Sequence, residues 1–308
     1  MDNRQLEVAF LCAVLEVLPA ASRDLSDLLV EAKSVEALIA GDVNFRSRSG
    51  ALYRYILKTV DTRRVDHWRA QFENLTKEWP DLRFVTVVDP EYPPLVQQAY
   101  DRPPLMFFRG SLPKGPATAI VGSRNTSPEA YAFAAETARQ LVEAGHVIIS
   151  GLARGIDESA HSACLHAGGR TVAVLGHALD VDLSPSEHSQ LGARIIDCGG
   201  ALVSPFRPGS PATTSSFVQR NTVISAFADV SVVVTADERS GSWSELQSAL
   251  AQGREVVLPR FVVDESSSIQ ALVRRERRVH AADTPWHVAQ IATRALNTRR
   301  GTNMTLND

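Results

Sequence analysis

Apolar residues in the first 80 positions recur every three or four residues, which is the spacing of one face of a helix. The recurring positions are Leu6, Phe10, Ala13 and Val17, then Leu25, Leu28 and Leu29, and then Leu52, Tyr55, Ile56 and Val60. The run Val65–Trp79 continues the pattern, and Pro80 ends it because proline cannot continue a helix. We therefore predict a small all-helical N-terminal domain over residues 1–80.

From residue 84 the pattern changes to short apolar runs rich in β-branched residues, the composition of strands. Phe84–Val88 and Leu105–Gly110 are two predicted strands, and from Ala117 strands and helices alternate in units of about 25 to 30 residues. Six further strands are predicted at Thr118–Val121, Val147–Ser150, Thr171–Leu175, Ala201–Ser204, Val230–Thr235 and Glu255–Leu258. The helices between them are predicted at Pro128–Ala144, Glu158–Ala167, Glu187–Cys198, Phe217–Ala226 and Trp243–Gln252. This alternation predicts an α/β fold with a doubly wound, mainly parallel sheet over residues 81–285.

Residues 286–308 are predicted to form a C-terminal helix near Trp286–Leu296 and a flexible tail, with no winged-helix domain. The net charge of −3 gives no global basic signal, so any polyanion would have to bind a local patch. Cys12, Cys164 and Cys198 are scattered without metal-ligand spacing, which predicts reduced thiols and no metal site. No stretch reaches the roughly 18 apolar residues of a membrane span, so we expect a cytoplasmic protein without membrane contact.

Glycine, serine and arginine gather where the predicted strands end. The first such loop holds Gly122, Ser123 and Arg124, and the second, Ser150–Asp157, includes Gly151, Arg154 and Gly155. Right-handed crossovers place these loops at one edge of the sheet, where helix N-termini attract anions. The spacing is neither a GxGxxG fingerprint nor a Walker loop. The sequence therefore predicts phosphate binding without a nucleotide cofactor.

Three later loops extend the same edge. Arg207 lies in the loop after the Ala201–Ser204 strand, and Ser240, Gly241 and Ser242 open the helix near Trp243, beside Arg239. Between them, Arg220 and Asn221 lie one turn into a helix, where they would either hold the loops together or touch a ligand. We predict a site that binds anions and has no catalytic residue, because no nucleophile with an evident base is present.

Some polar residues near these loops have structural interpretations. His177 and His188 have no neighbour in the sequence that would tune them, which favours structural or solvated roles. Asp157 is predicted to cap the next helix or to bond the backbone of the first loop.

The same residues make the chain resemble the DprA/Smf family of DNA-processing proteins over about residues 80 to 285. The motifs that carry the resemblance are Tyr92–Leu95, Pro104–Gly110, Ile120–Arg124, Ser150–Asp157, Ala160–His161, Val174–Gly176, Arg220–Asn221, Ile224–Ser225, Ser240–Ser242 and Gly253–Val256. The ordered series is far more specific than any single motif.

The resemblance implies an extended Rossmann-like domain that binds single-stranded DNA, forms a homodimer and loads a RecA-type recombinase during transformation or recombination. Carried over by position, Arg124 would be a principal DNA contact. The pocket around it would comprise Gly122, Ser123, Ser150, Gly151 and Arg154, and Asn221, Ser240, Gly241 and Ser242 would complete the edge. Val181, Pro205 and Thr235 depart from the family pattern, so the electrostatics of the pocket are expected to differ.

Two alternatives stay open from the sequence. The first is a nucleotide-binding sensor or an enzyme that resembles nucleoside-monophosphate phosphoribohydrolases, with Glu245 as its candidate acid. We favour a solvent-facing position for Glu245, which argues against that enzyme. The second is an adaptor that acts through its N-terminal helices in a DNA-uptake or defence complex.

Overall fold

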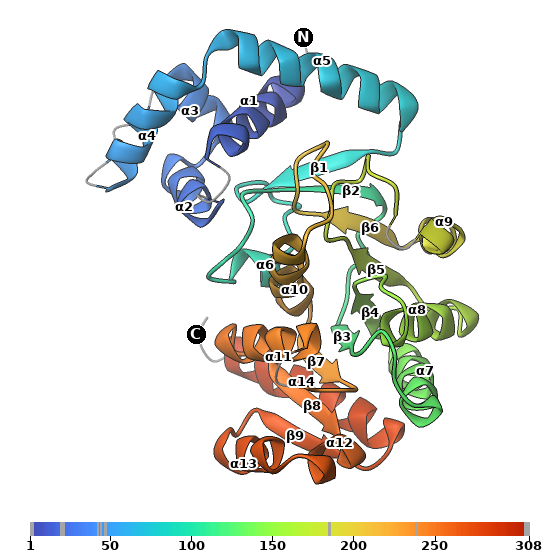
Figure 1. Ribbon diagram of the computed structural model, residues 1–308. Helices are drawn as coiled ribbons and strands as arrows, with labels where there is room; N and C mark the ends of the chain where they lie inside the picture. The colour runs from blue at the N-terminus through green and yellow to red at the C-terminus, as the bar shows by residue number, and fades with distance from the viewer. Residues whose placement is uncertain are drawn as a thin grey trace.

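One nine-stranded sheet organises the part of the chain that the structure describes, in the order β1-β2-β6-β5-β4-β3-β7-β8-β9 (Figure 1). The computed structural model describes residues 3–18, 22–41, 43, 45, 48–183, 186–237 and 240–304. Its strands are β1 (Arg83–Thr86), β2 (Leu105–Gly110), β3 (Ala117–Val121), β4 (Val147–Ser150), β5 (Thr171–Val174), β6 (Ala201–Ser204), β7 (Val230–Val233), β8 (Glu255–Pro259) and β9 (Val279–Ala282). Strands β3 to β9 run parallel, and β1 and β2 add an antiparallel edge.

Helices cover both faces of the parallel strands. They are α7 (Pro128–Glu143), α8 (Ile156–His166), α9 (Ser189–Asp197), α10 (Thr214–Phe227), α11 (Gly241–Ala251), α12 (Arg260–Glu265), α13 (Ser267–Arg275) and α14 (Pro285–Met304). Because neighbouring strand residues face opposite sides, Ala119 joins the apolar cluster that includes α10 and α11, while Ile120 joins the cluster of α7, α8 and α14. The predicted doubly wound, Rossmann-like α/β fold is confirmed.

The N-terminal helices lie against the antiparallel edge of the sheet (Figure 1). They are α1 (Asn3–Val17), α2 (Ser22–Ala32), α3 (Val35–Ala40), α4 (Arg48–Thr59) and α5 (Thr62–Glu78). Phe72 of α5 stacks on Phe107 of β2, with ring centroids 5.7 Å apart. Arg4 of α1 forms an ion pair with Asp89, which follows β1. The helical segment is therefore packed on the sheet through one shared apolar cluster.

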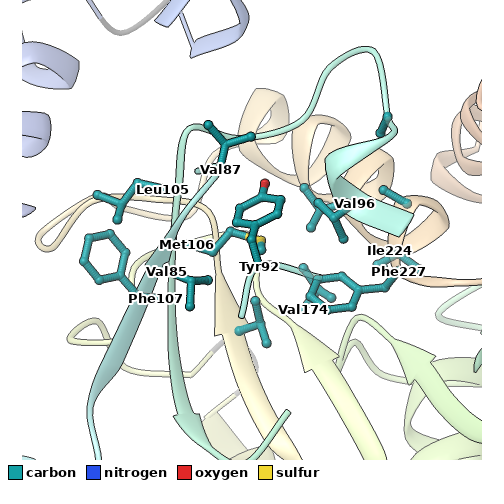
Figure 2. Packing of buried hydrophobic residues seen from close by; sticks show 14 of the residues in the cluster. Val85, Val87, Tyr92, Val96, Leu105, Met106, Phe107, Val174, Ile224 and Phe227 are labelled. Atoms are coloured by element: carbon teal, nitrogen blue, oxygen red, sulfur yellow. The ribbon is translucent and has the colours of Figure 1, made fainter. Parts of the chain in front are cut away.

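Tyr92 joins the antiparallel edge to α10. Its ring lies among Val85, Met106 and Phe227 (Figure 2), and its hydroxyl donates to the carbonyl of Pro103 at 2.6 Å. Burial raises the pKa of this phenol well above its usual range. The short helix α6 (Pro94–Gln97) follows directly, so the segment between β1 and β2 closes the core over α10.

Three elements near the C-terminus were not predicted: α12, α13 and β9. The β9 sequence Val-His-Ala-Ala has only one β-branched residue, and its strand conformation comes from parallel pairing with β8. The C-terminal helix α14 is also longer than predicted, because the expected flexible tail is helical to Met304. No helix among the described residues is long and apolar enough to span a membrane.

Candidate functional site

The order of the strands changes direction at β3, which lies between β4 and β7. In open α/β sheets a crevice forms where such a reversal separates the loops at the carboxyl ends of the strands. Here a hollow of about 290 Å³ lies at that position. Eight of the predicted site residues line it: Gly122, Ser123, Arg124, Arg220, Asn221, Ser240, Gly241 and Ser242.

Two glycines allow the loops around the hollow to approach one another. A Cβ on Gly151 would lie 1.7 Å from Nη1 of Arg220, and a Cβ on Gly155 would lie 2.5 Å from the carbonyl oxygen of Ser123. Gly155 also has a φ of 87°, a value that side chains disfavour. Both positions therefore require glycine: Gly155 allows the β3 and β4 loops to meet, and Gly151 leaves room for the guanidinium of Arg220.

Arg220 holds three elements together from a buried position. Its Nη1 donates to the carbonyl of Gly151 at 2.6 Å and to that of Val174 at 2.8 Å, so α10 is joined to the ends of β4 and β5. Burial lowers the pKa of Arg220, although the nearby Asp157 carboxylate counteracts the effect. Asn221 plays a similar part, because its Nδ2 donates to the carbonyl of Gly241 at 3.0 Å. Of the two roles considered for this pair, the structure shows the one that holds the loops.

Asp157 organises its own loop, which is neither of its two predicted roles. Helix α8 already begins at Ile156, so Asp157 lies in the first turn and not at the cap. Its Oδ2 accepts from the backbone N–H groups of Gly151 at 3.2 Å and Ala153 at 3.3 Å. Burial raises the pKa of this carboxyl, and the Arg220 charge opposes the shift.

Arg124 is the exposed cation of the hollow. Its guanidinium carbon lies 5.2 Å from the centre of the Phe217 ring, and it has no ion-pair partner among the described residues. The guanidinium carbon of Arg220 lies 5.7 Å from the same ring, so two cations flank Phe217. Opposite them α11 begins, where Ser240 accepts from the N–H of Trp243 at 3.2 Å. A helix N-terminus beside two guanidinium groups favours an anionic ligand.

Glu245 lies beneath the hollow, and the prediction that it faces solvent is wrong. Its side chain is 0% exposed, and Oε1 accepts from the Ser231 hydroxyl at 2.9 Å. Burial raises its pKa to about 8. The spacing of Ser242, Glu245, Leu246 and Ala249 puts these residues on one face of α11, and this pattern could have placed Glu245 inside.

Five predicted site residues do not line the hollow. Gly151 and Gly155 pack the loops, and Ser150 is buried with its hydroxyl donating to the carbonyl of Ile120 at 2.6 Å. Arg154 forms an exposed ion pair with Glu187. Arg207 lies with its guanidinium carbon 5.3 Å from the ring centre of Trp68 in α5. The sequence shows the positive charges of Arg154 and Arg207, but it does not show the side chains that these arginines contact.

Other residues singled out from the sequence support the loops. His177 and His188 are buried, with Nδ1 atoms 2.9 Å from the carbonyl oxygen of Ala178 and 2.8 Å from that of Leu152, so their structural roles are confirmed. Thr235, one of the departures from the family pattern, accepts the N–H of Ser123 and positions the first loop. Arg239 lies outside the described residues. No cluster that could hold a metal ion is present in the part of the chain that the structure covers.

A second hollow of about 730 Å³ continues from the first along the start of α10 and α11. The two share Arg124, Phe217 and Asn221, while Val218 and Trp243 add apolar surface to the second. A ligand that follows both would meet cations first and then apolar side chains.

The chain belongs to the family described as DNA recombination-mediator protein A, whose model matches residues 83–283. It is 36% identical over 194 residues to DNA processing protein DprA of Streptococcus pneumoniae, a match that covers 62% of this chain and 68% of that protein. It is also 38% identical over 181 residues to protein Smf of Escherichia coli, which covers 58% of this chain and about half, 48%, of Smf. The resemblance to the DprA/Smf family is thereby confirmed.

Two solved structures of DNA processing proteins are similar in fold to this chain. The X-ray structure of Streptococcus pneumoniae DprA has a TM-score of 0.66 and 25% identity, and the match covers 89% of this chain and 96% of that one. DNA processing protein A of Helicobacter pylori, whose structure concerns its single-stranded DNA binding mode, has a TM-score of 0.59 and 22% identity. That match covers 70% of this chain and 97% of that one, and it shows a shared fold.

Proposed function

We propose that this protein binds single-stranded DNA through its phosphate groups, without preference for sequence. The observation that carries the proposal is the exposed guanidinium of Arg124, unpaired among the described residues, on the rim of a hollow at the reversal point of the sheet. An arginine can pair two phosphate oxygens at once, and the first turn of α11 supplies further N–H donors. The single-stranded DNA binding of the Helicobacter pylori protein is in keeping with this ligand class.

The second hollow fits the bases of the same strand. Phe217 and Trp243 offer aromatic surface beside the cations, and stacking on such rings tolerates any base. The proposal therefore assigns phosphates to the Arg124 end and bases to the Trp243 end of one continuous groove.

We extend the proposal to the cellular role. Membership of a family of DNA recombination mediators supports action with a RecA-type recombinase, as a cytoplasmic homodimer, in transformation or recombination. Residues 81–285 would form the DNA-binding domain, with residues 1–80 and 286–308 as helical additions. In this role the protein binds its ligand and does not cleave it.

The test is the affinity of Arg124→Ala for labelled oligo-dT, measured by fluorescence anisotropy at two salt concentrations. Losing one bidentate phosphate contact costs about 1 to 3 kcal/mol, or roughly 5- to 150-fold in Kd. The salt slope should fall by about one, because one fewer phosphate is neutralised.

Arg170→Ala is the matched control. Arg170 is an exposed arginine that precedes β5, at the opposite edge of the sheet, and its loss should leave the affinity unchanged. Undetectable binding by the wild-type protein at micromolar concentration would overturn the proposed function. Unchanged affinity of a folded Arg124→Ala protein would overturn the assignment of the site.

A further inference from the structure

The carboxyl group of Glu245 has one oxygen that the protein does not use. Ser231 donates to Oε1 at 2.9 Å, while Oε2 is buried and has no hydrogen-bond partner among the described residues. Glu245 nevertheless borders the hollow, together with Arg124 and Arg220. A buried polar atom without a hydrogen-bond partner lowers the stability of the protein by about 1 to 3 kcal/mol. A ligand in the hollow could supply the missing hydrogen-bond partner of Oε2.

The hydrogen bond from Ser231 decides which oxygen could carry a proton. Because Oε1 already accepts a hydrogen bond, a neutral Glu245 has its O–H on Oε2. An ionised Glu245 would instead be a buried anion with a single donor, which is the more costly state. Burial raises the pKa of this carboxyl to about 8, in agreement with a neutral acid at neutral pH.

We propose that Glu245 is a further ligand-binding residue, whose Oε2–H donates a hydrogen bond to a phosphate oxygen of the strand held by Arg124. The inference rests on the proposed function and specifies how the floor of the hollow contributes to it. A phosphodiester offers only acceptors, so a neutral acid complements it and a carboxylate repels it.

The charged groups that face Glu245 come from three elements. Asp157 of α8 raises its pKa, and Arg220 of α10 lowers it. Arg124 of the β3 loop lies on the same hollow. His161 of α8, which interacts electrostatically with Arg220, has a pKa lowered to about 3 by burial, so it is neutral throughout the pH range of the test.

The inference predicts that binding weakens as the pH rises through about 8. If only the neutral form binds, the apparent Kd equals the intrinsic Kd divided by the neutral fraction, which falls about 10-fold between pH 7 and pH 9. The experiment measures oligo-dT affinity by anisotropy from pH 6.5 to 9.5 for the wild-type protein and for Glu245→Gln, at constant ionic strength.

The amide of Glu245→Gln keeps a hydrogen-bond donor and cannot ionise, so its affinity should stay constant from pH 7 to pH 9. Glu265→Gln, an exposed control on α12, should keep the wild-type pH dependence. Equal pH profiles for the wild type and Glu245→Gln would overturn the inference while leaving the proposed function intact, since Arg124→Ala tests that separately.

A second assay tests whether Glu245 has a catalytic role instead. The wild-type protein is incubated with AMP, and free adenine is measured by chromatography. Release of adenine that Glu245→Gln abolishes would make Glu245 an acid catalyst and overturn its assignment as a ligand of DNA phosphate. No release, together with the pH profile above, supports the assignment.

Discussion

Arg220 illustrates how a charged residue can define a binding site from inside the protein. Its guanidinium satisfies two backbone carbonyls and faces the buried Asp157 carboxyl, so it fixes where the β4 and β5 loops end. Arg124, in contrast, has its guanidinium exposed beside the same Phe217 ring. Arg220 holds the loops of the hollow in position, and Arg124 is available to bind a ligand.

This division of roles predicts a loss of stability for Arg220→Ala. The substitution leaves the carbonyls of Gly151 and Val174 without their donor and leaves Asp157 buried without a compensating charge. We expect the free energy of unfolding to fall by about 2 to 5 kcal/mol, measured by urea denaturation with circular dichroism. An unchanged urea midpoint would show that Arg220 is not a structural residue, and Arg124→Ala serves as the surface comparison.

The residues of the site could be predicted only in part. Glycine, serine and arginine at strand ends predicted the hollow, because few other roles need that combination there. The sequence did not show that Arg154 and Arg207 lie outside the hollow, since a positive charge in the sequence does not reveal a partner such as Glu187 or Trp68. The burial of Glu245 was missed because a glutamate on a helix is usually exposed.

Helix α10 brings Phe217, Arg220 and Asn221 to the hollow, and its start is fixed by a reciprocal cap. The Thr213 hydroxyl accepts from the N–H of Ser216 at 3.0 Å, and the Ser216 hydroxyl accepts from the N–H of Thr213 at 2.9 Å. The helix therefore begins at Thr214, three residues before the predicted start at Phe217. The cap places Phe217 within the first turn.

Thr213→Ala should destabilise this end of α10. Losing the cap costs about 1 kcal/mol of stability, which thermal unfolding would detect as a lower Tm. Thr213→Ser keeps a hydroxyl and should restore most of the loss. A Tm for Thr213→Ala equal to that of the wild type, with Thr213→Ser also unchanged, would contradict the importance of the cap.

Strands and helices with clear apolar periodicity were predicted to within a few residues, because burial on both faces selects β-branched runs. The elements near the C-terminus that escaped prediction are short, with 6 residues in α12, 9 in α13 and 4 in β9. The conformation of β9 depends on β8, which supplies its hydrogen bonds. The residues of β9 alone do not reveal this pairing with β8.

At the scale of the whole molecule, the N-terminal helices and the sheet depend on one another. Phe72 of α5 and Phe107 of β2 are each 2% exposed, and their rings stack on each other. The contact between Arg207 and Trp68 adds a polar link between the β6 loop and α5. The helical pattern predicted these helices, but not that their apolar faces would complete the core of the sheet.

Removing residues 1–80 should therefore destabilise what is left. The fragment 81–308 would expose Phe84 and Phe107 to water, because both rings pack on Phe72. We expect a lower Tm and increased binding of a hydrophobic dye relative to the full chain. A fragment with the same Tm and no dye binding would show that the helices fold and act separately.

Trp243 lies on the wall of the second hollow, so its fluorescence can report on what binds there. An indole that a nucleobase covers loses fluorescence, so DNA bound along both hollows should quench the emission of Trp243. The chain has four tryptophans, and Trp68 is buried under Arg207. The difference in emission between the wild type and Trp243→Phe would isolate the signal, and occupancy of the groove could then be followed in real time with unlabelled DNA.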